Sequence, residues 1–178
     1  MAKITIFGLA GTGTSSTGKM LAEKLGYTFM SSGNMFRKMA EETNHTLKEL
    51  EELSKKESKY DIELDQKIKK FGEENNNFIV ESRLAWYFIP DSLKIKLTCD
   101  FDARIERIAN REGISAQEAK EHTIHREEAI FERYARYYGI TDFSDDKFDL
   151  VINNTDIPLS GVVEKIENFI KSSSLLPL

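Results

Sequence analysis

Residues 8–15 form a short loop whose glycines and hydroxyls suit phosphate binding. The sequence GLAGTGTS matches the pattern G-x-x-x-x-G-K-[ST] at every fixed position except the lysine, where Thr14 stands. Glycines let backbone N–H groups turn inward around anionic oxygens, and the start of the following helix adds partial positive charge. Ser15 is predicted to place its hydroxyl on Mg²⁺. The residues predicted to bind the phosphates of ATP are Gly8, Gly11, Thr12, Gly13, Thr14 and Ser15.

Two other interpretations of this loop are weaker. A plain strand-to-helix turn that binds no phosphate is disfavoured because strand, loop and helix follow in the order that phosphate binding requires. A dinucleotide-binding turn would need an acidic residue at the end of the second strand, and that strand ends in Ser31 and Ser32. Thr14 can donate a hydrogen bond but brings no charge, so the charge must come from elsewhere.

Arginines are concentrated in one part of the chain, between Arg104 and Arg136. Arg126 and Arg133 are separated by about two helical turns, or ~10 Å, which puts them on one face of a helix. Guanidinium groups suit phosphate oxygens and stabilise the charge that develops in phosphoryl transfer. The alternative is a solvated helix whose arginines pair with neighbouring glutamates. For Arg126 and Arg133 together we favour the functional interpretation.

Further candidates follow the second and third predicted strands. Ser32, which could also simply cap the next helix, is grouped with Gly33 and Arg37 as a site for the phosphate of an acceptor. Glu81 could hold the water shell of Mg²⁺ or orient the acceptor, and Arg83 could bridge two phosphate groups; a strand-end ion pair is the alternative. Two aspartates at the start of a predicted helix are expected to bind the sugar or base of the acceptor, or only to complement the helix dipole. They are Asp61 and Asp65.

Strand and helix patterns alternate along the chain, which predicts an α/β fold with a five-stranded parallel sheet flanked by helices. The predicted strands are 3–7, 27–30, 77–80, 93–98 and 148–152. The predicted helices are 15–25, 33–42, 47–57, 62–74, 102–111, 115–138 and 159–170. In such a sheet ligands bind at the carboxyl ends of the strands, where the candidate residues fall.

Composition limits the class of protein. A length of 178 residues fits one domain, and the net charge of −5 argues against a nucleic-acid polymer as partner. The single cysteine excludes an intrachain disulfide, and neither a signal sequence nor a membrane-spanning run is evident. We therefore expect a cytoplasmic monomer that binds no membrane. The three histidines are interpreted as surface residues because their spacing is not that of metal ligands.

The chain resembles the cytidylate kinases, in particular their archaeal-type branch, from residue 4 to about residue 170. The matching segments, in order, are 11–14, 32–33 with 36–37, Asp61 with Asp65, 81–86, 107–112, 126–127 with 133–134, and 148–153. The resemblance implies an adenylate-kinase-like P-loop kinase with a monophosphate-binding region at 31–75 and a lid at 113–142. It implies transfer of a phosphoryl group from ATP to CMP or dCMP with Mg²⁺.

By position, Ser32, Arg37 and Arg83 would hold the acceptor phosphate, and Arg126 and Arg133 would clamp the phosphates from the lid. Arg83, Arg126 and Arg133 are thus the predicted catalytic residues. Two departures concern substrate choice: Ser82 replaces a glycine of the branch, and Ile130 stands where bacterial-type relatives have a base-reading aspartate. The alternatives are a P-loop kinase for another nucleotide or small molecule, and a nucleotide-binding protein without transfer activity.

Overall fold

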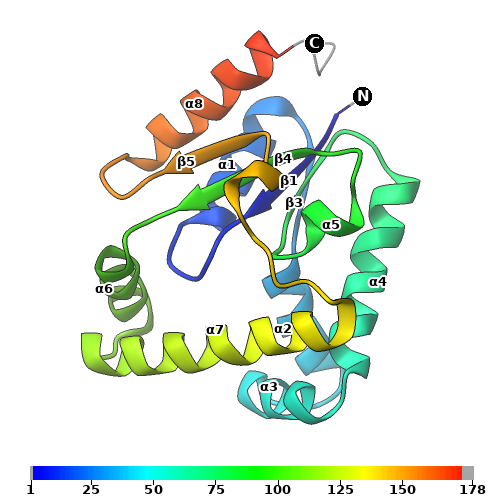
Figure 1. Cartoon of the computed structure of the whole chain (residues 1–178), viewed down its shortest axis with the longest axis vertical. Helices are drawn as coiled ribbons and strands as arrows, with labels where there is room; N and C mark the ends of the chain where they lie inside the picture. The colour runs from blue at the N-terminus through cyan, green and yellow to red at the C-terminus, as the bar shows by residue number, and fades with distance from the viewer. Residues whose placement is uncertain (1, 174–178) are drawn as a thin grey trace.

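Five parallel strands form one sheet in the computed structural model, which describes residues 2–173 (Figure 1). Their order across the sheet is β2 (Thr28–Ser31), β3 (Phe78–Glu81), β1 (Lys3–Phe7), β4 (Leu93–Thr98) and β5 (Leu150–Asn153). All neighbouring pairs are parallel. The predicted fold class is therefore confirmed, and all five strands lie within two residues of their predicted positions.

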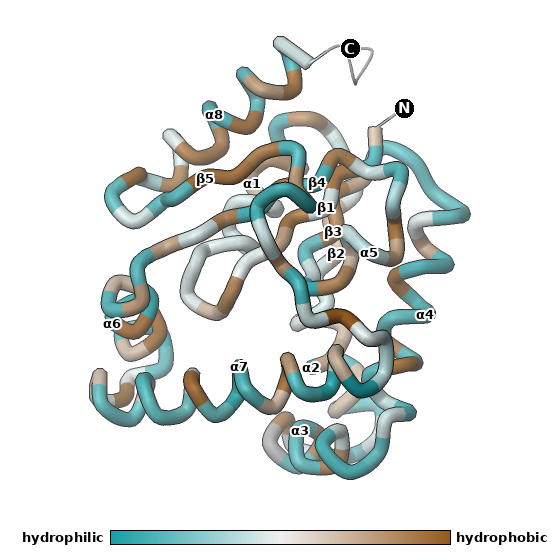
Figure 2. The backbone as a smooth tube through the Cα atoms, viewed as in Figure 1, coloured by the Kyte–Doolittle hydropathy of each residue, from teal (hydrophilic) through white to brown (hydrophobic). Residues whose placement is uncertain are grey.

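Each face of the sheet is covered by helices because side chains alternate along a strand. Ile79 of β3 packs in the main core with residues of α1 (Thr14–Leu25) and α8 (Leu159–Ser172). Its neighbours Phe78 and Val80 face the opposite way, into a second core with residues of α4 (Lys59–Glu74) and α5 (Ala85–Phe88). Figure 2 shows the resulting pattern, with apolar colour in the strands and mixed colour along the helices.

Three consecutive helices form a smaller unit beside the β2 edge. They are α2 (Ser32–Glu42), α3 (Leu47–Lys56) and α4, and their own core includes Met39, Leu50 and Tyr60. A capping box begins α3: Thr46 accepts from the backbone of Glu49, whose side chain accepts from the backbone of Thr46. This unit coincides with the region predicted to bind the acceptor.

A helical hairpin extends from the other side of the sheet. It consists of α6 (Phe101–Glu112) and α7 (Ala116–Tyr138), which share a small core that includes Ile105, Ile108 and Ala119. Ser115 and Glu118 form the predicted capping box at the start of α7. In Figure 1 α7 runs from α6 beneath the sheet toward α2 and α3. The predicted lid is thus built around one long helix that reaches the acceptor-side helices.

Short elements and some boundaries differ from the sequence prediction. The helix α5 and the 3₁₀ turn η1 (Asp145–Lys147) were not predicted, because elements this short contain too few residues for a periodic signal. The helix α4 begins three residues earlier than expected. Within residues 2–173 no helix combines the length and apolarity needed to span a bilayer.

Candidate active site

The carboxyl ends of three neighbouring strands meet at the carboxylate of Glu81. The register of the sheet sets Glu81, at the end of β3, level with Ile6 of β1 and Ser31 of β2. Three hydroxyls donate to it: Ser31 Oγ at 2.7 Å, Thr14 Oγ1 at 3.0 Å and Ser15 Oγ at 3.1 Å. One carboxylate therefore joins the predicted phosphate loop to the start of the acceptor-side helices.

The phosphate loop takes a conformation that its glycines make possible. Gly11 and Gly13 have φ values of +83° and +79°, in the left-handed region where a side chain would be strained. A Cβ on Gly11 would also lie 2.7 Å from the carbonyl oxygen of Arg104, and one on Gly8 would lie 2.4 Å from Thr12 Oγ1. The close contact at Gly8 and the positive φ of Gly13 explain glycine at the two fixed positions of the motif, and both effects act on Gly11 at a variable position.

Thr14 and Ser15 begin α1 and differ in what they offer a ligand. Thr14 is buried, and its hydroxyl is engaged by Glu81, so the position of the missing lysine carries a hydrogen-bonded neutral group. Ser15 is exposed. The hydroxyl of Ser15 and the carboxylate of Glu81 are hard oxygen donors 3.1 Å apart, and such donors together with water suit Mg²⁺. Groups of three or more His, Cys, Asp or Glu that could hold a metal are absent from residues 2–173.

The start of α2 carries the predicted acceptor-phosphate residues and corrects one detail. Ser31, rather than Ser32, is the N-cap: its Oγ accepts from the backbone N–H of Asn34 at 3.4 Å. The alternative in which Ser32 caps the helix therefore does not hold, because the strand continues one residue further than expected. Ser32 and Gly33 therefore lie in the first turn of the helix, and Arg37 Nη2 folds back to donate to Asn34 Oδ1 at 2.5 Å.

Arg83 follows β3 and is held close to α7. Its Nε is buried and has no hydrogen-bond partner within the described chain. The pKa of Arg126 on α7 is lowered, mainly because neighbouring groups displace part of the water around its partly exposed side chain and further because of the charge of Arg83, while Glu51 opposes the change. The two predicted catalytic arginines Arg83 and Arg126 are thus near enough for their charges to interact.

The two predicted aspartates of α4 both contact α7. Arg133 Nε lies 2.7 Å from Asp61 Oδ2, an ion pair whose atoms are poorly aligned for a hydrogen bond, and the hydroxyl of Tyr138 donates to Asp65 Oδ2 at 2.7 Å. Burial raises the pKa of Asp65 to about 7, and it raises the pKa of Asp61 against the opposing charge of Arg133. These acids now connect two helices, and their predicted contact with an acceptor stays a prediction.

Arg126 makes a second bridge from α7 to the acceptor side. Its Nη2 lies 2.9 Å from Glu51 Oε1 on α3, and both side chains are partly exposed, at 46% and 34%. Arg126 and Arg133 therefore share a face of α7, as their spacing predicted, and that face meets α3 and α4. The predicted binding of Arg126 and Arg133 to the phosphates stays a prediction.

Comparison with known proteins identifies the family. Residues 3–156 match the model of the cytidylate kinase-like family. The chain belongs to the cytidylate kinase-like family. A cytidylate kinase of Methanobrevibacter smithii is 38% identical over 168 residues, covering 94% of this chain and 98% of the relative. A cytidylate kinase of Ignicoccus hospitalis is 36% identical over 172 residues, covering 96% and 99%. The suspected resemblance is confirmed.

Solved structures share the fold at low sequence identity. A protein of Eubacterium ventriosum has a TM-score of 0.74 at 17% identity and covers 97% of this chain and 100% of its own. A shikimate kinase of Bacteroides thetaiotaomicron has a TM-score of 0.66 at 16% identity and covers 96% and 98%. These similarities cover nearly all of the present chain, and at such low sequence identity they establish its fold and not its function.

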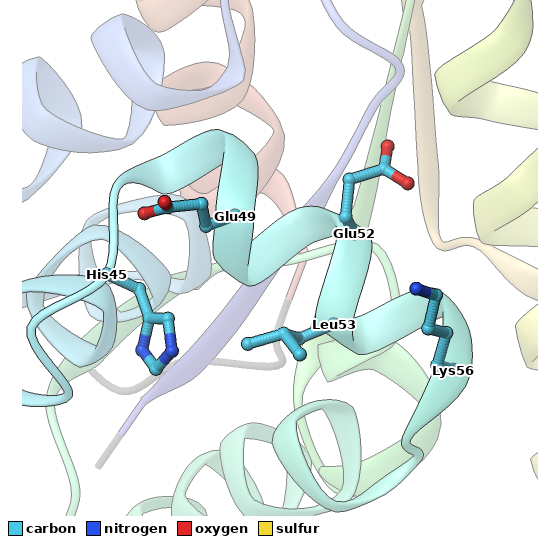
Figure 3. Close-up of a pocket in the computed structure, with 5 residues that line it drawn as sticks. All are labelled: His45, Glu49, Glu52, Leu53 and Lys56. Carbon is cyan, nitrogen blue, oxygen red and sulfur yellow. The ribbon is translucent and has the colours of Figure 1, made fainter.

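A pocket elsewhere in this cytidylate kinase-like chain lies apart from the predicted site residues. Figure 3 shows that it is lined by residues of α3 and of the turn before it, namely His45, Glu49, Glu52, Leu53 and Lys56. Glu49 is engaged in the capping box of α3, and its hydrogen bonds with Thr46 lower its pKa. The expectation of surface histidines holds for His122 and His125, whereas His45 is half-buried.

The sequence analysis missed several residues that the fold brings to the site. Ser31 was given no role although it lies in the segment that follows the second strand, and Tyr138 was missed because a tyrosine at the end of a helix gives no chemical signal. Arg107 and Asn154 lie against the phosphate loop. The segments that contain Arg107 or adjoin Asn154 resembled the family. Their contacts with the phosphate loop could not be predicted, because the loop lies far from both residues in the sequence.

Proposed function

We propose that this protein transfers the γ-phosphoryl group of ATP to the phosphate of CMP or dCMP, giving ADP and the corresponding diphosphate. The observation that carries the proposal is the meeting of the phosphate loop, the start of α2 and the end of β3 at Glu81. A donor site and an acceptor site then share one edge of the sheet. The relatives named cytidylate kinase favour cytidine as the base.

The residues have separate roles in this proposal. The backbone N–H groups of the loop and α1 would bind the phosphates of ATP, and Ser32, Gly33, Arg37 and Arg83 would bind the acceptor phosphate. Ser15 and, through water, Glu81 would hold Mg²⁺, which supplies neutralising charge for the phosphates when bound. The aspartates of α4, Asp61 and Asp65, would contact the acceptor's sugar or base.

The chemistry needs positioning more than proton transfer. An oxygen of the acceptor phosphate forms the new bond to the γ-phosphorus, while the bond from that phosphorus to the bridging oxygen of ADP breaks and leaves its electron pair on ADP. The attacking oxygen is already anionic, so no strong general base is required. Arg83, Arg126 and Arg133 would stabilise the charge on the transferring group.

The acceptor-binding role of α2–α4 and the closing of α7 as a lid are part of the proposal. Closure would exclude water and so limit hydrolysis of ATP. We also propose that the protein works as a monomer in the cytoplasm. The net charge of −5 supports a single nucleotide, rather than a nucleic-acid polymer, as the partner.

A coupled assay of ADP release tests the proposal. It supplies ATP and Mg²⁺ with CMP, dCMP, UMP, AMP or GMP in turn. We expect rapid turnover with CMP or dCMP and little with the purine nucleotides. Turnover with another acceptor would overturn the base assignment and keep the phosphotransferase mechanism, whereas ATP binding without turnover of any acceptor would overturn both.

A further inference from the structure

Consecutive carbonyl groups of the phosphate loop are held from outside by donors that lie far away in the sequence. Each donor is a side chain, and the hydrogen bonds follow the order of the loop. They run from Arg104 Nη1 to the carbonyl of Ala10 at 3.2 Å, from Arg107 Nη1 to that of Gly11 at 3.4 Å, and from Asn154 Nδ2 to that of Thr12 at 2.7 Å. The loop is thus fixed on the side away from its concave, phosphate-facing surface.

The geometry of the peptide bond gives these contacts a consequence for ligand binding. In a planar trans peptide the C=O and the following N–H point in opposite directions. When the carbonyls of Ala10 and Thr12 turn outward, the N–H groups of Gly11 and Gly13 turn inward, whereas the N–H of Thr12 donates to the carbonyl of Leu9 at 3.2 Å. The N–H groups of Gly11 and Gly13 form the nest that surrounds phosphate oxygens. The outer donors therefore fix the direction of the inner ones.

We propose that Arg104, Arg107 and Asn154 are positioning residues that hold the N–H groups of the phosphate loop in their binding orientation. They would offset part of what the loop loses by having Thr14 in place of lysine. The inference rests on the proposed function only in taking the ligand of this loop to be the phosphates of ATP. We call these three residues the outer ring.

The outer ring is itself firmly held. Arg104 and Asn154 are each 4% exposed. Asn154 Oδ1 accepts from Arg107 Nη1 at 3.4 Å, and the backbone N–H of Asn154 donates to the carbonyl of Thr98 at 2.8 Å, at the end of β4. Arg104 and Arg107 are neighbours on one face of α6 because they are three positions apart. Rigid elements on both sides thus present the donors.

Charge distinguishes the two arginines of the outer ring. Arg104 forms an ion pair with Glu127 of α7, with Nη1 2.7 Å from Oε1. The hydrogen bonds of Arg107 go to neutral acceptors: the carbonyls of Gly11 and Thr155, and both oxygens of Asn154. Arg107 therefore brings a positive charge behind the loop, where it favours an anion on the inner side, without occupying the space of the ligand.

Two variants of Asn154 test the orienting role. Asn154→Asp keeps the size of the side chain and an acceptor for Arg107, but it removes the donor to Thr12, whereas Asn154→Ala removes the side chain. Calorimetry would give the Kd for ATP, and competition would give the Kd for inorganic tripolyphosphate, which has no base or sugar. We expect both constants to rise about tenfold in Asn154→Ala, as for loss of one buried hydrogen bond, and further in Asn154→Asp, because the added negative charge also opposes an anion in the loop. The KM for CMP should change by less than about twofold.

A matched control is available in Asn75→Ala. The Nδ2 group of Asn75 donates to the carbonyl of Phe71 at 3.0 Å at the end of α4, so the control removes the same kind of bond away from the loop. Its Kd values for ATP and tripolyphosphate should match those of the wild type. Thermal unfolding of all variants identifies any that fail to fold, and Arg107→Lys, which keeps the charge and loses the forked hydrogen bonds, should also weaken tripolyphosphate binding.

Each outcome decides the inference separately from the proposed function. Unchanged Kd values for ATP and tripolyphosphate in folded Asn154→Asp would overturn it, and so would an equal loss of affinity for CMP. A wild-type protein that binds ATP but phosphorylates no nucleotide would overturn the proposed function, and the tripolyphosphate constants would still decide the role of the outer ring.

Discussion

Asp65 is a carboxyl group whose surroundings oppose its charge. It is 7% exposed, and Tyr138 donates to it, but no cation is paired with it in the described structure. Burial raises its pKa to about 7, from an ordinary value of 3.8. The folded protein therefore binds this proton more tightly than the unfolded chain does. Ionising Asp65 in the folded state costs stability.

The sign of the pH dependence follows from this difference in pKa. Between about pH 4 and pH 7 the folded state holds more protons than the unfolded state, so the free energy of unfolding falls as the pH rises through that window. Asp65→Asn keeps an acceptor for Tyr138 and removes the charge. We expect the variant to be more stable than the wild type by about 2–4 kcal/mol at pH 8 and equally stable near pH 4. Urea unfolding at both pH values measures the difference.

A gain of the same size at both pH values would show that the effect comes from packing rather than ionisation. Asp91→Asn is a suitable control, because Asp91 is exposed and its ion pair with Lys3 lowers its pKa. The contribution of Asp91 to stability is lost only as the pH falls below about 4, so Asp91→Asn should change the free energy of unfolding by nearly the same amount at pH 8 and near pH 4. Activity of Asp65→Asn with CMP would separately test the predicted acceptor contact of this residue.

At the level of single residues, the sequence was informative where a residue type is tied to a fixed local geometry. The position of the phosphate loop was predicted because glycines let the backbone turn its N–H groups inward, and Gly11 and Gly13 adopt positive φ values, which glycine tolerates best. The hydrogen bonds from Thr14 and Ser31 to Glu81 could not be predicted, because they depend on how three strands are aligned. A shift of one residue at the end of β2 was enough to make Ser31, and not Ser32, the N-cap of α2.

The helix α7 is the element that joins the two sides of the candidate site. Its contacts run to α3 through Arg126 and to α4 through Arg133 and Tyr138. Near its middle, Glu127 pairs with Arg104 beside the phosphate loop. A helix that contacts both the proposed acceptor site and the proposed ATP site is well placed to move when either ligand binds.

We expect Arg133→Ala to lower kcat by at least about 100-fold, because a guanidinium that stabilises the transferring phosphoryl group is worth that much or more. The same expectation holds for Arg126→Ala. Arg136→Ala removes an exposed arginine from the same helix and should leave kcat close to that of the wild type. Steady-state kinetics with CMP and thermal unfolding should be recorded together, since Arg133→Ala leaves Asp61 buried without its cation. A kcat near the wild-type value in both folded variants would remove α7 from the catalytic machinery.

Long elements were predicted well and short ones were not. The capping box of Ser115 and Glu118 marked the start of α7 because it is a local feature of four residues. Helix α5 has only four residues, too few to show a helical period, and its fold depends on packing against β1 and α4. Local signals thus fix where helices start, and tertiary contacts decide the segments that lack such signals.

At the scale of the molecule, the order of the strands determines which loops meet. The chain passes from β1 to the edge strand β2, returns to β3 and then crosses to β4, so β1 lies between β3 and β4. Loops that follow β1, β2 and β3 consequently converge on one edge, as is general for ligand sites in open α/β sheets. Alternating strands and helices predicted a parallel sheet, but the order of the strands came only from the structure.

This convergence leads to an expectation for ligands that occupy both sites. A compound that joins adenosine to cytidine through a chain of phosphates would bind both sites in one association event and should be held far more tightly than either nucleotide. At a concentration 100 times its Kd it would stabilise the folded state by about 2.7 kcal/mol, or roughly 5–10 °C in Tm for a chain of this size.

Thermal unfolding with the joined compound should give a larger shift in Tm than ATP and CMP supplied together at equal concentrations. The gain should shrink in Arg133→Ala, where α7 would lose its proposed phosphate contact, and it should persist in Arg136→Ala. A shift no larger than that of ATP by itself would mean that the two sites do not lie within reach of one phosphate chain, and the acceptor would then have to bind away from the edge where β1, β2 and β3 end.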